Sequence, residues 1–73
     1  MTKLVTLGWN PDEDSLEEFV VRSTDETANT IAEYEAKGYN YLTHADTHHE
    51  AYRGVHRERF VRSITFKKPE VIL

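Results

Sequence analysis

The stretch that decides the fold is residues 23–38, which read STDETANTIAEYEAKG. Its first four residues fit a capping box, in which the Ser23 hydroxyl accepts a hydrogen bond from the Glu26 amide and the Glu26 side chain reaches back. Small apolar residues then recur at helical spacing, and Lys37-Gly38 supplies a favourable charge and a C′ glycine. We therefore predict a helix over residues 24–37 that packs closely on a sheet.

The segments on both sides of this helix have the composition of strands. Residues 4–7 and 16–22 precede it, joined by a polar turn around Pro11, and they predict a hairpin. Residues 39–44 and 55–68 follow it, and Pro69 ends the last strand. The order β-β-α-β-β predicts an α+β fold, with an antiparallel sheet of about four strands and one helix packed on one face.

Length and composition limit the possible classes of protein. A chain of 73 residues predicts a single domain over residues 1–73, and it has no cysteine for a disulfide or a thiolate nucleophile. It has no apolar run of the ~20 residues that span a bilayer, so we expect a soluble, cytoplasmic protein. It has no nucleophile elbow and no glycine-rich phosphate loop, so we expect neither an enzyme nor a cofactor.

Charge is divided unevenly along the chain. Residues 1–36 carry nine acids and two bases, a net charge of −7, whereas residues 37–73 carry seven bases and four acids, a net charge of +3. In a small domain an uneven distribution of charge affects which partners the surface binds more than it affects the fold. It indicates a binding protein.

Five acids lie within seven residues in the predicted hairpin loop and the start of its return strand. Such a strip can present charge where phosphates sit in a basic groove, and the alternative is a solvated turn that maintains solubility. The acids are Asp12, Glu13, Asp14, Glu17 and Glu18.

Four arginines lie within ten residues near the C-terminus. On a strand, Arg53, Arg57 and Arg59 share one face and Arg62 points to the other. Forked guanidinium donors suit a carboxylate-rich partner, and the alternative is cross-strand pairing with the protein's own acids. Tyr52 lies beside them as a candidate interface residue. Because the whole chain is at −4, we expect no direct binding to nucleic acid.

Histidines and aromatic residues offer two further possibilities. His44, Asp46 and His48 share a strand face and could form a metal triad, but residues 47–54 resemble a loop, so a solvated hairpin end is the favoured interpretation. Most aromatic residues are needed for the core. Tyr34 is expected on the far side of the helix and is a second interface candidate.

Two resemblances bear on these expectations. Residues 37–42, Lys-Gly-Tyr-Asn-Tyr-Leu, and residues 64–69, Ile-Thr-Phe-Lys-Lys-Pro, resemble segments of a family of small sheet-plus-helix domains. The length, the acid-rich hairpin before one helix and the sheet-forming C-terminal half resemble small bacteriophage proteins that inhibit host RNA polymerase. That resemblance implies a regulator that binds bacterial RNA polymerase in the host cytoplasm and inhibits transcription or alters termination. We expect the protein to be a monomer.

Three functional expectations follow. The first is a protein-binding regulator of RNA polymerase that uses the acidic loop and the arginine-bearing last strand. The second is a small metal- or ligand-binding domain built on the histidines. The third is an acidic mimic of nucleic acid directed at another host target.

Overall fold

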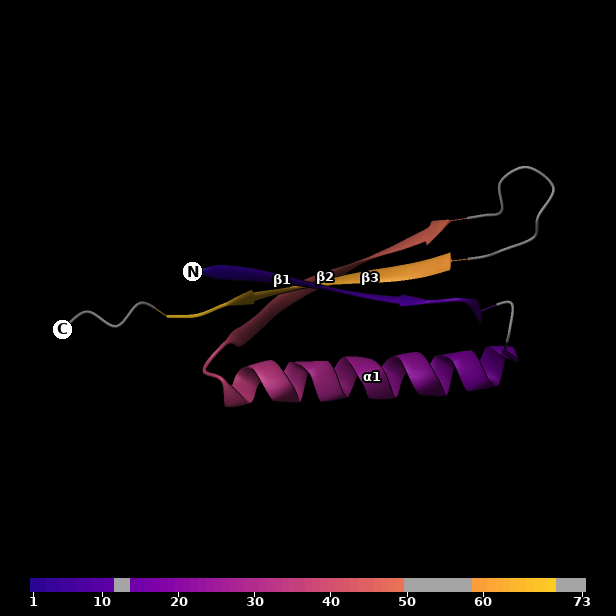
Figure 1. Cartoon of the computed structure of the whole chain (residues 1–73), viewed down its shortest axis with the longest axis horizontal. Helices are drawn as coiled ribbons and strands as arrows, with labels where there is room; N and C mark the ends of the chain where they lie inside the picture. The colour runs from indigo at the N-terminus through magenta and orange to yellow at the C-terminus, as the bar shows by residue number, and fades with distance from the viewer. Residues whose placement is uncertain (12–13, 50–58, 70–73) are drawn as a thin grey trace.

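The computed structural model describes residues 1–11, 14–49 and 59–69, which form one helix and three strands (Figure 1). The elements are β1 (Thr2–Trp9), α1 (Leu16–Ala36), β2 (Asn40–His49) and β3 (Arg59–Lys67). The α+β class is confirmed, with an antiparallel sheet of three strands in the described residues. The candidates Asp12, Glu13, Tyr52, Arg53 and Arg57 lie outside the described residues.

The last strand in sequence is the central strand of the sheet. The strand order is β1-β3-β2, and β3 pairs antiparallel with both neighbours, in registers that include Thr2↔Lys67 and His49↔Arg59. The register with β2 shifts between Tyr41 and Thr43, so Leu42 is an extra residue in the strand. The expected hairpin of residues 4–7 with residues 16–22 is therefore wrong, because β1 pairs with β3 instead.

Residues 16–22 form the first two turns of α1, so the prediction of a second strand there is wrong. Ser15 is the N-cap, with φ −68° and ψ 159°, and its Oγ accepts a hydrogen bond from the Glu18 amide at 3.1 Å. Glu17 and Glu18 lie in the first turn, where carboxylates interact favourably with the helix dipole. These start signals outweigh the strand preference of the β-branched pair Val20-Val21.

Ser23 is correspondingly not the N-cap but a buried residue inside the helix. Its hydroxyl donates to the carbonyl of Val20 at 3.2 Å, and the hydroxyl of Thr27 donates to the carbonyl of Ser23 at 2.7 Å. The predicted end of the helix is confirmed within one residue, since α1 ends at Ala36 and Gly38 has a φ of +92°. Glycine suits this left-handed C′ position because it has no Cβ.

The core lies between α1 and one face of the sheet. Trp9, Ile64 and Phe66 are its buried apolar residues. At the N-terminal half of the helix, Phe19 makes edge contacts with the rings of Trp9 and Phe60, at centroid distances of 6.2 and 5.4 Å. The core is therefore small and largely aromatic.

Tyr34 closes this core at the C-terminal half of the helix. Its ring stacks on Phe66, with centroids 4.9 Å apart, and makes an edge contact with Tyr39 at 5.8 Å. The expectation that Tyr34 faces away as an interface residue is wrong, because Tyr34 follows Ile31 by three residues and therefore lies on the same face of the helix. Tyr41, expected in the core, is 39% exposed.

The opposite face of the sheet carries mostly small side chains. Strand alternation places Leu4, Thr6 and Gly8 of β1 there, together with Val61, Ser63 and Thr65 of β3 and Thr43, Ala45 and Thr47 of β2. Leu4 is 62% exposed on this face. Figure 1 shows α1 lying along one side of the sheet, and no other described helix covers the second side. Among the described residues, no helix is both long and apolar enough to cross a bilayer.

Candidate protein-binding surface

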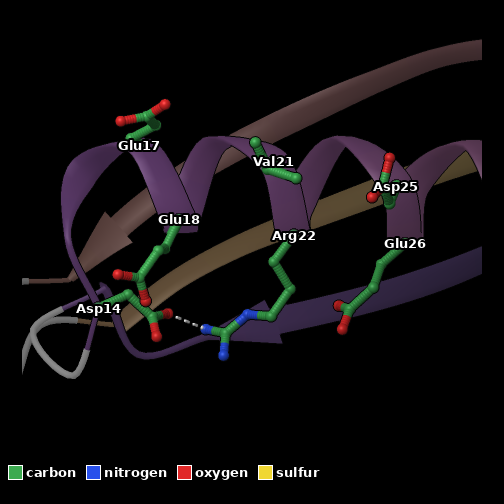
Figure 2. A pocket seen from close by; sticks show the side chains of 7 residues that line it. All are labelled: Asp14, Glu17, Glu18, Val21, Arg22, Asp25 and Glu26. Carbon is green, nitrogen blue, oxygen red and sulfur yellow. Dashed lines mark ion pairs between the residues drawn. The ribbon is translucent and has the colours of Figure 1, made fainter.

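Acidic side chains gather on the first three turns of α1 and the residue before its N-cap. They surround an open depression of about 570 Å³ (Figure 2). We call this set the acidic surface; it consists of Asp14, Glu17, Glu18, Val21, Arg22, Asp25 and Glu26. Five carboxylates and one guanidinium give it a formal net charge of −4.

The helical repeat explains why these side chains meet. Glu18, Arg22 and Glu26 are four residues apart, and so are Glu17, Val21 and Asp25, which places the six residues in two neighbouring rows on the helix. Figure 2 shows Glu18, Arg22 and Glu26 projecting to one side of α1, and Glu17 and Asp25 projecting to the other. The sequence predicted Asp14, Glu17 and Glu18. It missed the others because residues 16–22 were assigned to a strand.

Two of the five carboxylates are held by contacts within the protein. Arg22 Nη2 lies 2.5 Å from Asp14 Oδ2, and the Asp14 side chain is only 16% exposed. Glu26 Oε2 accepts a hydrogen bond from the indole nitrogen of Trp9, which links the helix to the end of β1. Glu17, Glu18 and Asp25 are exposed, and Val21 among them is 56% exposed. The acidic surface thus offers exposed carboxylates around an apolar contact point.

Arg62 is used inside the protein. Its Nε and Nη2 donate to the two carboxylate oxygens of Asp46 at 2.7 and 3.1 Å, and its Nη1 donates to Thr27 Oγ1 at 3.0 Å. The guanidinium also lies 5.7 Å from the centre of the Trp9 ring. Arg62 therefore makes the cross-strand pairing with an acid of the same protein that the sequence analysis gave as the alternative, and it joins β3 to β2 and to α1.

The same contact changes the ionisation of both groups. The hydrogen bond from Arg62 holds the pKa of Asp46 below its ordinary value of 3.8, and burial opposes part of that shift. The hydrogen bond to Asp46 likewise raises the pKa of Arg62 from its ordinary value, and burial opposes part of that shift. Both ions are therefore favoured in the folded protein.

Arg59 lies on the face of the sheet opposite to Arg62, as strand alternation predicted. Its guanidinium crosses Gly8 of β1, where a Cβ would lie 2.9 Å from Arg59 Nη2. Gly8 also lines a smaller depression of about 250 Å³ together with Arg22 and Glu26 of the acidic surface. Arg59 therefore lies over β1 on the face of the sheet away from α1, and it remains a contact candidate.

His44, His48 and His49 lie on strand β2, which continues through residues 47–49, so the expectation of a loop beginning at Thr47 is wrong there. The Tyr41 hydroxyl lies 2.6 Å from Nδ1 of His44, Asp46 is held by Arg62, and the rings of His48 and Phe60 are 6.3 Å apart. In residues 1–11, 14–49 and 59–69, no group of three or more potential ligands is arranged to hold a metal ion.

Comparisons with known proteins indicate no function for this chain, so its function is inferred from the geometry described above. No family model matches the chain, and no curated protein or solved structure matches it. Grouped carboxylates beside an exposed valine are suited to a basic protein surface, because complementary charge steers the encounter and the apolar contact excludes water. The acidic surface is therefore the candidate site for function.

Proposed function

We propose that this protein is a small protein-binding regulator that binds bacterial RNA polymerase in the host cytoplasm and inhibits transcription. The observation that carries the proposal is the acidic surface, where exposed Glu17, Glu18 and Asp25 surround Val21 on a folded helix. The choice of polymerase rests on the resemblance in length and layout to phage inhibitors. Asp12 and Glu13 belong to the same acidic segment and are included as contacts.

The mechanism is competition for a basic groove. Proteins that bind nucleic acids gain much of their affinity from lysine and arginine contacts to phosphates. A rigid row of carboxylates can occupy such contacts and exclude the nucleic acid without any chemical step. Arg59, which lies over β1 on the face of the sheet away from α1, is proposed to contact acidic groups at the border of the groove.

The experiment compares two charge-neutralising variants of α1. Glu17→Gln with Asp25→Asn removes two charges from the acidic surface, and Glu33→Gln with Glu35→Gln removes two charges from the other end of the helix. Binding to purified bacterial RNA polymerase is measured by surface plasmon resonance at several salt concentrations. Promoter-dependent transcription is measured in parallel.

We expect the first variant to associate more slowly, with a weaker dependence on salt, and to inhibit transcription less. The second variant, with the same change in net charge, is expected to behave like the wild-type protein. Equal losses of binding and inhibition in both variants would show that the net charge of the protein, and not the acidic surface, determines binding to polymerase. If the wild-type protein neither binds polymerase nor inhibits it, the polymerase assignment is wrong.

A further inference from the structure

Strand β2 is an edge strand of the sheet that the described residues form. In the described structure it pairs only with β3, and all ten of its residues are exposed. Edge strands carry a row of unpaired backbone donors and acceptors, and proteins usually guard them with lysine, proline or a bulge. β2 has no lysine or proline, and its irregularity at Leu42 leaves residues 43–49 regular. The other edge, β1, carries Lys3.

The sequence of β2 is nearly symmetric about Ala45. Residues 43–47 read Thr-His-Ala-Asp-Thr, so reversing the order exchanges only His44 and Asp46. If two copies of β2 pair antiparallel about Ala45, each Thr43 lies opposite Thr47 and each His44 lies opposite Asp46. Threonine pairs and pairs of a carboxylate with a donor are favourable across antiparallel strands.

The side chains of this register can form hydrogen bonds across the strands. The Tyr41 hydroxyl lies 2.6 Å from Nδ1 of His44, and in the tautomer whose Nδ1 accepts from that hydroxyl the ring proton is on Nε2, which can then donate. The Asp46 carboxylate is fixed by Arg62 yet its side chain is 34% exposed, so its oxygens can accept a further hydrogen bond. Shifting the centre to Asp46 would place two Asp46 carboxylates opposite each other, which is unfavourable.

We propose that two copies of this protein associate through their β2 edges, antiparallel and centred on Ala45, to form a continuous six-stranded sheet. This replaces the monomer expected from the sequence. The proposal is independent of the polymerase assignment, because the acidic surface and the β2 edge use different residues. The occupant is a second copy because β2 is complementary to itself in charge and in side-chain size.

The first test is the oligomeric state of the full chain, measured by sedimentation velocity over a range of concentrations. Ala45→Arg places two like charges on the dimer axis, and Thr6→Arg is its matched control, since Thr6 and Ala45 flank Ser63 in the same row of the sheet. We expect the wild type and Thr6→Arg to dimerise equally, and Ala45→Arg to weaken dimerisation about tenfold or more. A wild type that stays monomeric up to about 1 mM overturns the proposal.

The second test fixes the register and does not depend on the arginine variants. The chain has no cysteine, so single cysteines report unambiguously. Residues directly opposite each other in antiparallel strands have Cα atoms ~4.5–5.5 Å apart, within the range of a disulfide. Thr43 and its copy would lie four residues apart along the strands, roughly 13 Å, which is too far.

We therefore expect Ala45→Cys to form an intermolecular disulfide readily under mild oxidation, and Thr43→Cys and Thr6→Cys to form it at least tenfold more slowly. Mixing Thr43→Cys with Thr47→Cys should restore rapid cross-linking between the two different chains. Faster cross-linking through Thr6→Cys than through Ala45→Cys would place the interface at β1 and overturn the proposal. Equal rates at all positions would show random collision and overturn it as well.

Discussion

Replacing Ser15 and Ser23 separately with alanine distinguishes the observed start of α1 from the start that the sequence suggested. Ser15→Ala removes the hydroxyl that accepts from the Glu18 amide at 3.1 Å. Loss of an N-cap lowers the free energy of unfolding by ~1 kcal/mol. In a domain of this size 1 kcal/mol corresponds to a fall in Tm of about 4–8 °C.

For Ser23→Ala, two opposing contributions to the free energy of unfolding nearly cancel. It removes a hydrogen bond to the Val20 carbonyl at 3.2 Å, inside the helix. The loss of that bond, ~1 kcal/mol or less, is opposed by the higher helix propensity of alanine, roughly 0.5 kcal/mol. We therefore expect the net change in unfolding free energy to be within about 0.5 kcal/mol of zero.

The assay is thermal unfolding followed by far-ultraviolet circular dichroism, with urea unfolding followed by the fluorescence of the single tryptophan, which is buried. Ser15→Asp serves as the rescue variant, because aspartate also caps helices and favours the first turn. If Ser23→Ala lowers Tm more than Ser15→Ala does, the helix begins near Thr24 and the reasoning about its first two turns fails.

Three further predictions concern the core, the ion pair and the helix end. Phe66→Ala should lower the unfolding free energy by ~3–5 kcal/mol in urea titrations, and Phe66→Leu by much less, because Phe66 is fully buried; equal effects would contradict this packing. Because the pKa of Asp46 is lowered in the folded protein, its pairing with Arg62 makes its full contribution to stability at pH values well above 3.8. That contribution decreases as the pH falls through the pKa of Asp46 in the folded state. Asp46→Asn should therefore flatten the acid limb of stability against pH, and an unchanged acid limb would count against the ion pair. Gly38→Ala should destabilise by about 1 kcal/mol because of its φ of +92°, whereas Gly8→Ala, which meets only the end of a flexible arginine side chain, should change Tm little.

The three strands could be predicted from the sequence because their side chains alternate and their flanking residues form turns. Their ends shifted, as with β2, which runs to His49 although Thr47-His48-His49 looks polar enough for a loop. The C-terminal half of β2, residues 45–49, was missed because its side chains are polar and exposed, so no apolar alternation marks that half. The last strand was predicted over residues 55–68 and is confirmed over Arg59–Lys67, where Phe60, Ile64 and Phe66 share one parity and face the helix; residues 55–58 lie outside the described residues.

The first two turns of α1 could not be predicted because Phe19, Val20 and Val21 form a run of strand-forming residues, and because the residues from Ser23 to Glu26 fit a capping box that marks a later helix start. The polar atoms of Ser23, Glu26 and Thr27 are satisfied within the helix and by Trp9 and Arg62. Those two partners are 17 and 35 residues away from Glu26 and Thr27, respectively. Reading local periodicity does not reveal contacts over such separations. The same error concealed Asp25 and Glu26 as members of the acidic surface.

The position of β3 between β1 and β2 has a consequence for how the chain is made. Thr2 pairs with Lys67, and among residues 1–11, 14–49 and 59–69 the strands β1 and β2 join the sheet only through β3. A nascent chain can form α1 early, since helices need only local contacts, but no strand has a partner until β3 leaves the ribosome. Sheet assembly is therefore a late event in synthesis, and a ribosome that stalls before Arg59 would release a helix flanked by two unpaired strands.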